Sequence, residues 1–241
     1  MMSRLQASAF ATIFAASTFV AGAALAETIK LSLVQTNDID RMEEDDGRGG
    51  FARLAAVVAA ERARGDVLFV HAGDTISPSL LSGIDKGTHI IDILNNMGVD
   101  LMVPGNHEFD FGPEIFQTRI SEAKFPIISS NISMPGGGGG PANTTVDRIV
   151  EVDGVKLGFY GLTTTTTPSV SSPGDEISFL DPLETGLDAA EDLRALGADI
   201  VLALVHTDLE VDLELVRNTP PILSSPAMTS ISSPSSTAGR C

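Results

Sequence analysis

"THIIDILNNMGVDLMVPGNHEFDFG", running from Thr88 to Gly112, is the stretch that best predicts the fold of this chain of 241 residues. Its first part has the apolar spacing of an amphipathic helix, and Gly98 stands where such a helix would end. The apolar run Leu101–Val103 predicts a strand, and Pro104 and Gly105 predict a turn after it. An amide, an imidazole and two carboxylates follow within five residues. The stretch therefore predicts a helix, a strand and a polar turn, as α/β proteins have them.

The same alternation extends to both sides of this stretch. Strands are expected at 28–35, 66–74, 100–103, 125–132 and 198–208, and a hairpin at 147–162 around the turn Asp153-Gly154. Helices are expected at 51–64, 88–98, 113–124 and 182–197. Strands that alternate with helices predict an α/β fold with mostly parallel or mixed sheets.

The charge of the chain limits its partners. The formal net charge is -17, with 43% hydrophobic and 20% charged residues, which is ordinary for a globular protein. Such a charge argues against binding to nucleic acid or to an anionic membrane surface. An anionic small molecule remains a possible substrate if a metal supplies local positive charge. The acidic run at 208–216 is typical of a solvated surface.

The first 26 residues have the pattern of a secretory leader. Arg4 gives a positive start, an apolar run follows, and Ala24–Ala26 fits a small-residue cleavage site. We therefore expect residues 1–26 to be removed and the mature protein to be periplasmic or secreted, with no membrane attachment. The single cysteine, Cys241, excludes an internal disulfide. The mature chain is expected to be a monomer.

Polar clusters follow four of the expected strands. Because the carboxyl ends of parallel strands meet at one edge of a sheet, these side chains are expected to converge. The candidates are Asp38, Asp40, Asp74, Asn106, His107 and His206. Carboxylates that converge repel one another, and divalent cations relieve the repulsion. Mixed oxygen and imidazole ligands suit Zn, Mn or Fe, and two such ions can act together in displacement at phosphorus.

Six segments resemble motifs of one family in their residues and in their order along the chain: "TNDID", "AGDT", "GNHEFDFG", "FPIISSNI", "EVDGVKLGFYGLTT" and "ADIVLALVH". They resemble the calcineurin-like metallophosphoesterases, in particular the periplasmic 5'-nucleotidases and UDP-sugar hydrolases, over residues 29–216. The resemblance implies an α-β-β-α sandwich of mixed sheets and two divalent metal ions (Mn, Zn, Mg or Fe). It also implies hydrolysis of phosphate esters, nucleotides above all, by a metal-activated water. The alternatives within the family are phosphodiesters and nucleotide sugars.

The resemblance also implies a ligand set. Asp38 matches a carboxylate ligand of the first metal, and Asp74 matches the carboxylate that bridges the two metals. Asn106 and His206 match ligands of the second metal. Asp40 stands where the family usually has a histidine, and an oxygen ligand there would shift the preference from Zn toward Mn or Mg.

The catalytic histidine of the family matches His107, which is not a ligand but stabilises charge on the phosphoryl group or the leaving oxygen. Asp110, three residues further on, matches the carboxylate that orients it. Of the two other histidines, His71 is expected to be structural and His89 to lie on a helix surface.

The end of the chain departs from the family. The later G-H-x-[HQ] motif, which supplies the remaining ligands, is missing from the sequence. Residues 218–241 are rich in Ser, Pro and Thr, which is typical of a disordered tail. The codons permitted for Pro221 to Ile231 also allow a shifted frame that contains the motif, so a frameshift is a second explanation. We therefore expect a truncated phosphoesterase domain at 27–217. The alternative to an enzyme is a catalytically impaired exported product.

Overall fold

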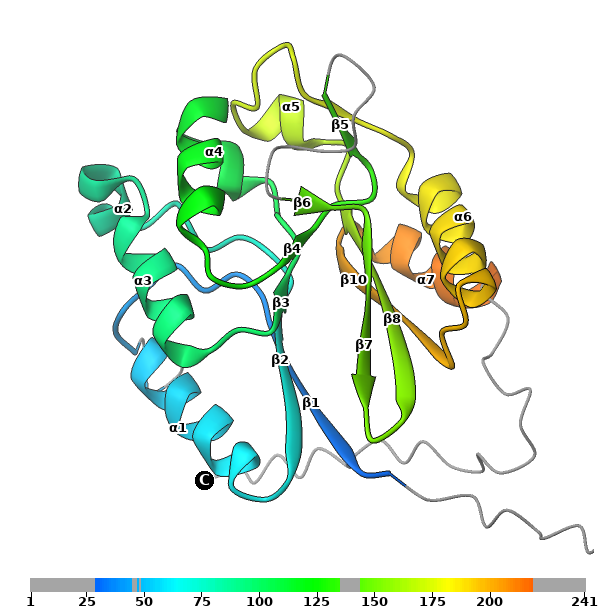
Figure 1. The fold of residues 1–241 in the computed structure, drawn as a ribbon. Helices are drawn as coiled ribbons and strands as arrows, with labels where there is room; N and C mark the ends of the chain where they lie inside the picture. The colour runs from blue at the N-terminus through cyan, green and yellow to red at the C-terminus, as the bar shows by residue number, and fades with distance from the viewer. Residues whose placement is uncertain (1–28, 45–46, 48, 135–143, 219–241) are drawn as a thin grey trace, which may run out of the picture.

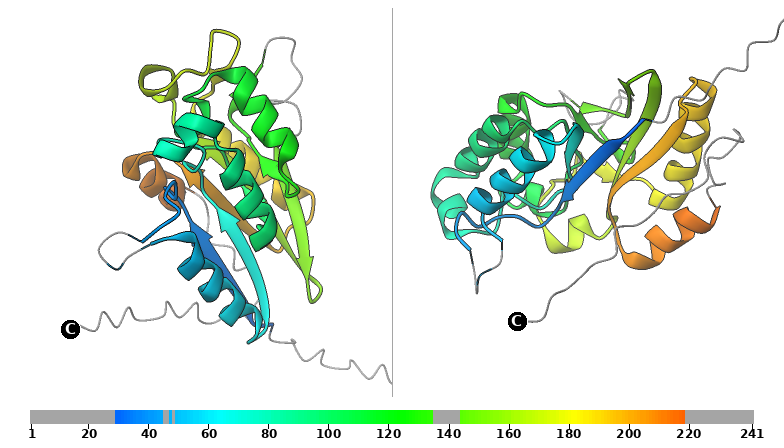
Figure 2. Two further views of the ribbon diagram at one scale, coloured as in Figure 1. Left: turned by 90° about the vertical axis from the view of Figure 1, so that its left-hand side faces the viewer. Right: turned by 90° about the horizontal axis from the view of Figure 1, so that it is seen from below.

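The computed structural model describes residues 29–44, 47, 49–134 and 144–218 (Figure 1). The expected leader, nearly all of the tail and most of the glycine-rich connector "MPGGGGGPAN" lie outside the described residues. Two β-sheets face each other, and helices cover the outer side of each sheet (Figure 2). The α-β-β-α sandwich that the resemblance implied is confirmed, and of its two sheets the first is parallel and the second is mixed. None of the described helices has the length and apolar character needed to cross a membrane.

The first sheet has five parallel strands in the order β1-β2-β3-β4-β6. Their bounds are β1 Leu31–Thr36, β2 Asp66–His71, β3 Leu101–Met102, β4 Ile127–Ile128 and β6 Thr144–Thr145. Because the strands are parallel, the turns after β1, β2 and β3 all leave the sheet at the same edge.

Helices α1, α3 and α4 cover the outer face of the first sheet, and the short helix α2 lies against α3 (Figure 1). Their bounds are α1 Phe51–Arg62, α2 Leu80–Asp85, α3 Thr88–Met97 and α4 Pro113–Glu122. Gly98 ends α3 in the left-handed conformation, and Pro113 occupies the first turn of α4, as expected. The sequence did not predict α2. A core that includes Phe69, Ile90 and Phe116 joins α1, α3 and α4 to the sheet.

The second sheet has three strands in the order β10-β8-β7. The bounds are β7 Asp147–Val152, β8 Val155–Thr163 and β10 Ile200–His206. Strands β7 and β8 form the antiparallel hairpin expected around Asp153-Gly154, and β10 lies parallel to β8. Helices α6 (Pro182–Ala195) and α7 (Leu209–Asn218) cover the outer face of this sheet. The acidic run at 208–216 is thus mostly helix, and its Leu215 is buried against the core.

The core between the sheets follows the alternation of side chains along the strands. Leu68 and Val70 of β2 face the second sheet, whereas Phe69 faces the helices. On β8, Phe159 faces the first sheet and Tyr160 faces α6. The strands β2 and β8 therefore bury side chains on both faces, which explains their nearly continuous apolar runs in the sequence.

The segment 125–132, expected as one strand, is divided between two sheets. After β4 the chain turns, and β5 (Ile132–Ser133) pairs with β9 (Ser178–Phe179) instead. The turn is held by Asn131, whose fully buried amide donates to the carbonyl of Thr163 at 2.8 Å and accepts from its N–H at 2.8 Å. The expectation of one strand was wrong because a buried amide here replaces the backbone pairing of a sheet.

Candidate functional site

The turns that follow β1 and β2 lie against each other. Asp38 has a positive φ of 53°, and its N–H donates to the carbonyl of Gly73 at 3.0 Å. Gly73 and Asp74 also have positive φ, at 82° and 59°. A positive φ is costly for a residue with a side chain, so the surrounding contacts must hold Asp38 and Asp74 in place.

The turn that follows β3 packs against the turn after β2 through backbone atoms. A Cβ added to Gly73 would lie 2.3 Å from the nitrogen of Gly105. A Cβ added to Gly105 would lie 2.2 Å from Oδ1 of Asp74. Only glycine permits this approach. The two glycines therefore bring Asp74 next to the start of the 3-10 turn η1 (His107–Phe109).

Asp74 lies at the centre of the site and is buried. Its Oδ1 accepts the backbone N–H of His107 at 2.8 Å. Its Oδ2 lies 3.2 Å from Nε2 of His206 and 4.0 Å from Nε2 of His107. Burial raises the pKa of Asp74, but the hydrogen bond and the charge of His206 outweigh it, so the pKa is lowered. Asp74 is therefore a carboxylate at neutral pH.

His206, the last residue of β10, reaches the site from the second sheet. Its Nδ1 lies 2.7 Å from the carbonyl of Ala72, which can only accept a hydrogen bond. Nδ1 therefore carries the proton, and Nε2 faces Asp74. Burial lowers the pKa of His206, but Asp74 outweighs it and raises the pKa to about 9. The neutral form presents the lone pair of Nε2, which is what a metal ion binds.

Asp38, Asp74 and His206 together form a candidate metal centre. One ligand atom from each of them lies within 4.8 Å of the others, and it is the only such group of three among the described residues. Two carboxylates and one imidazole make a donor set that suits a divalent transition metal. Three of the six residues that the strand ends were expected to bring together thus meet, and they come from the ends of three separate strands.

His107 and Asp110 form a second unit beside this group. Nδ1 of His107 lies 2.6 Å from Oδ2 of Asp110, and Oδ1 of Asp110 accepts a hydrogen bond from Oγ of Ser171 at 2.7 Å. Burial lowers the pKa of His107, but the hydrogen bond of Asp110 outweighs it and raises the pKa. Ser171 follows the short helix α5 (Thr167–Val170). The carboxylate of Asp110 thus orients the imidazole of His107, and Ser171 holds that carboxylate in place.

The remaining residues singled out in the sequence do not join this group of three. Asp40 is half-buried in the loop after β1, but it is not part of the group of three. Asn106 is half-buried and directly precedes η1. His71 is fully buried, with Nδ1 3.0 Å from Oγ1 of Thr36. His89 is not a surface residue as expected, because its ring packs against Asp85 with Nδ1 2.8 Å from Oδ2.

Glu108 is a residue of the site that sequence reasoning left without a role. It is buried and accepts hydrogen bonds from four backbone N–H groups. Its pKa is raised, by burial most and then by the charge of Asp74, and the hydrogen bonds offset only part of this. A carboxylate in "GNHEFD" is expected to face solvent or to bind a ligand. Nothing in the sequence therefore indicated that Glu108 is buried and accepts backbone hydrogen bonds.

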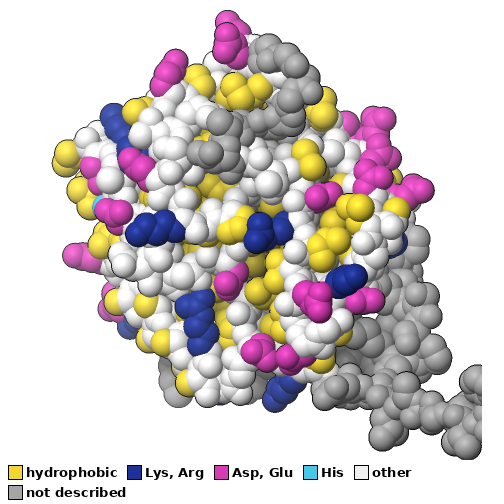
Figure 3. All heavy atoms as spheres, viewed as in Figure 1, with side chains coloured by type: hydrophobic (Ala, Val, Ile, Leu, Met, Phe, Trp, Pro, Cys, Tyr) yellow, Lys and Arg dark blue, Asp and Glu magenta, His cyan; other side chains and the backbone are white. Residues whose placement is uncertain are grey.

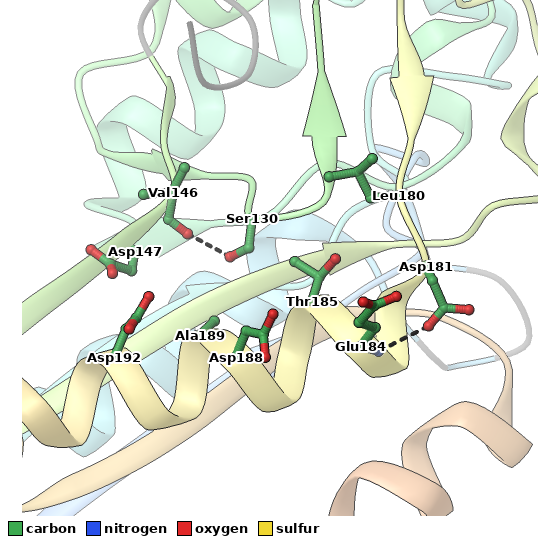
Figure 4. A pocket seen from close by; sticks show the side chains of 10 residues that line it. All are labelled: Ser130, Val146, Asp147, Leu180, Asp181, Glu184, Thr185, Asp188, Ala189 and Asp192. Atoms are coloured by element: carbon green, nitrogen blue, oxygen red, sulfur yellow. Dashed lines mark hydrogen bonds between the residues drawn. The ribbon is translucent and has the colours of Figure 1, made fainter. Parts of the chain in front are cut away.

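A separate hollow of about 480 Å³ lies beside α6 (Figure 4). Five carboxylates line it, belonging to Asp147, Asp181, Glu184, Asp188 and Asp192. Figure 3 shows acidic side chains gathered over this helix. Burial, with the charge of Asp192, raises the pKa of Asp147. Among the described residues no Lys, Arg or His lines the hollow, so its lining is unsuited to a phosphate ester.

Comparison with known proteins agrees with this geometry. The family model for calcineurin-like phosphoesterases matches residues 31–219. The chain belongs to this family. Its expected 5'-nucleotidase branch is also confirmed, because the 5'-nucleotidase of Bos taurus is 32% identical over 203 residues. That match covers 76% of this chain but 35% of the relative, so the chain spans about a third of the length of the curated relatives it matches.

Solved structures of family members have the same fold. The NAD nucleotidase of Haemophilus influenzae superposes with a TM-score of 0.71 at 28% identity, covering 77% of this chain and 35% of that one. The 5'-nucleotidase precursor of Thermus thermophilus gives 0.69 at 31% identity, covering 78% of this chain and 39% of that one. The phosphoesterase domain described above is therefore similar to part of each of these larger proteins.

Proposed function

We propose that this chain is a metal-dependent phosphoesterase that hydrolyses the phosphate ester of nucleotides. The observation that carries the proposal is the meeting of Asp38, Asp74 and His206 beside the oriented imidazole of His107. Family membership and the 5'-nucleotidase relatives support the substrate class. Because those relatives are much longer, the proposal concerns what this domain can do.

Asp38, Asp74 and His206 would hold the metal, and Asp40 and Asn106 are the proposed further ligands of a two-metal centre. Bound divalent ions supply positive charge for the phosphoryl oxygens and make water nucleophilic at neutral pH. Mn or Mg is favoured over Zn if Asp40 is a ligand, because oxygen ligands suit harder ions. Without such an ion, the carboxylates of Asp38 and Asp74 would repel an anionic substrate.

The residues of the chain itself have separate tasks in this reaction. His107, with Asp110 fixing Nδ1, would present a protonated Nε2 to the charge that develops on the leaving oxygen. Its side chain is 36% exposed, so a substrate can reach it. Asp74 holds the backbone of His107, so the imidazole and the metal ligand are positioned by one hydrogen bond.

We further propose that the protein works outside the cytoplasm, as a monomer, after removal of residues 1–26. The leader-like composition of that segment supports the location. The Thermus thermophilus relative, which is described as a precursor, supports it as well. The domain then comprises residues 27–217.

The decisive assay combines metal, substrate and one variant. The purified chain, stripped with a chelator and reloaded with Mn²⁺ or Zn²⁺, should release phosphate from AMP faster than it cleaves bis(p-nitrophenyl) phosphate. His107→Ala should lower kcat by about 10²–10⁴-fold while retaining the metal. Metal binding without turnover under any condition would contradict the enzyme and support the impaired product. A preference for the diester would point to a phosphodiesterase.

A further inference from the structure

Glu108 joins the two turns that carry the site. Its Oε2 accepts the N–H of Asp74 at 2.7 Å and the N–H of Gly105 at 2.5 Å. Its Oε1 accepts the N–H of Thr75 at 2.7 Å and that of Ile76 at 3.2 Å. Each oxygen therefore has two donors, and Oε2 binds one donor from each turn.

This arrangement accounts for the burial of an acidic side chain. Glu108 is 1% exposed, and a buried carboxylate needs strong hydrogen bonds to offset the loss of hydration. Four N–H groups, each with a partial positive charge, provide that compensation. Glutamine could not satisfy all four donors in this way, because an amide has only one oxygen. The pattern therefore requires the two oxygens of a carboxylate.

The bonds of Glu108 and of Asp74 close a loop. The side chain of Glu108 holds the backbone of Asp74, which has the costly φ of 59°. The side chain of Asp74 in turn accepts the backbone N–H of His107, the residue before Glu108. Movement of Glu108 would therefore release Asp74 from its left-handed conformation and move Oδ2 away from His206.

We propose that Glu108 is a positioning residue for the metal centre: without touching the metal, it fixes the Asp74 carboxylate and thereby sets the affinity of the site. This inference rests on the proposed function for its metal. The hydrogen bonds of Glu108 to the two turns do not depend on a metal, so the role of Glu108 and the proposed function can be tested separately.

The first test measures Mn²⁺ binding by isothermal titration calorimetry. Glu108→Gln should weaken Mn²⁺ affinity about 10–100-fold, as loss of a partner that orients a ligand does. Glu108→Asp keeps both oxygens and should give a smaller loss. Ile120→Val, a buried change on α4 in the core around the helices, serves as a control for lost packing. It should leave the affinity unchanged.

The second test needs no metal. In the metal-free chain, Glu108→Gln should speed amide hydrogen exchange at Asp74 and Gly105 by about tenfold or more relative to Ile120→Val. Unchanged exchange at these two amides would overturn the role of Glu108, whatever the metal result. Unchanged Mn²⁺ affinity in Glu108→Gln, with the wild type binding Mn²⁺, would overturn it as well. A wild-type chain that binds no Mn²⁺ would instead count against the proposed function.

Discussion

Single residues in unusual backbone conformations determine the site. Asp38 and Asp74 both have positive φ, and each carries a carboxylate that points toward His206. The sequence predicted that these residues converge, because each follows a strand. It could not separate Asp38 from Asp40, which lies two positions further along the same loop. Which side chain of a loop faces a site depends on individual φ and ψ values that no residue pattern specifies.

The pair of His107 and Asp110 gives the first residue-scale prediction. Asp110→Asn keeps the shape of the side chain but replaces the carboxylate that stabilises the imidazolium form of His107. We expect kcat for AMP to fall by about 10²-fold or more, because proton donation by the imidazole is weakened. Steady-state kinetics with saturating Mn²⁺ measure the effect.

Ser171→Ala is the matched control for this change. It removes the bond to the other oxygen of Asp110 and leaves the bond to His107 intact. The loss of kcat should be severalfold, clearly smaller than for Asp110→Asn. Equal losses in both variants would contradict a dominant role for the bond between Asp110 and His107, as would a loss of Mn²⁺ affinity in Asp110→Asn.

At the scale of elements, long periodic segments were predictable and short ones were not. The helices α1, α3, α4 and α6 and the hairpin of β7 and β8 lie within a few residues of their expected bounds. The helices α2 and α5, with six and four residues, have too few turns to show a period. Helix α7 was not predicted, because the apolar residues of this helix are spaced among many charged ones and the segment was interpreted as an acidic run.

Strand β8 contains a glycine that sets how closely the sheets approach. A Cβ added to Gly161 would lie 2.7 Å from the carbonyl oxygen of Ile128 in the first sheet. Because this neighbour is backbone, it cannot move aside as a side chain would. Gly161→Ala should therefore lower the free energy of unfolding by about 1–3 kcal/mol, as overpacking does. Urea denaturation followed by circular dichroism measures the change.

Gly83→Ala is the opposite case. Gly83 lies in α2, its φ is not positive, and no atom would meet an added Cβ within 4 Å. Alanine there should raise the free energy of unfolding by about 0.5–1 kcal/mol, because it restricts the unfolded chain and favours the helix. Gly83→Ala thus serves as the control for Gly161→Ala. If Gly161→Ala were as stable as the wild type, the two sheets would be able to move apart at that point without cost.

At the scale of the whole molecule, the candidate metal centre joins the two sheets. Asp38 and Asp74 follow strands of the first sheet, whereas His206 ends β10 of the second. A bound metal would therefore connect the sheets, and its removal should lower the melting temperature of the whole domain.

This stabilisation should depend on pH through His206. Burial lowers its pKa, but Asp74 raises it from 6.5 to about 9. Without metal, the stability gained from protonated His206 is fully present below pH 6.5 and is lost as the pH rises through about 9. Because a metal must displace this proton, Mn²⁺ affinity should rise by up to about tenfold per pH unit in this window.

Differential scanning fluorimetry of the metal-free and Mn²⁺-loaded chain at about pH 6.5 and about pH 8.5 checks this. The increase in Tm caused by Mn²⁺ should be larger at the higher pH. His206→Gln has no proton to lose, so its metal-free Tm should vary less between the two pH values. An increase that is the same at both pH values would contradict His206 as a ligand.

The contact between His206 and the carbonyl of Ala72 joins residues 134 positions apart. Contacts this distant form late in folding, because the entropy of closing a long loop must be overcome first. Asp38 and Asp74, which follow neighbouring parallel strands, can meet while the second sheet is still undocked. A newly synthesised chain would then offer a metal two carboxylates at first and the imidazole only in the last step, so tight metal uptake should report the completion of folding.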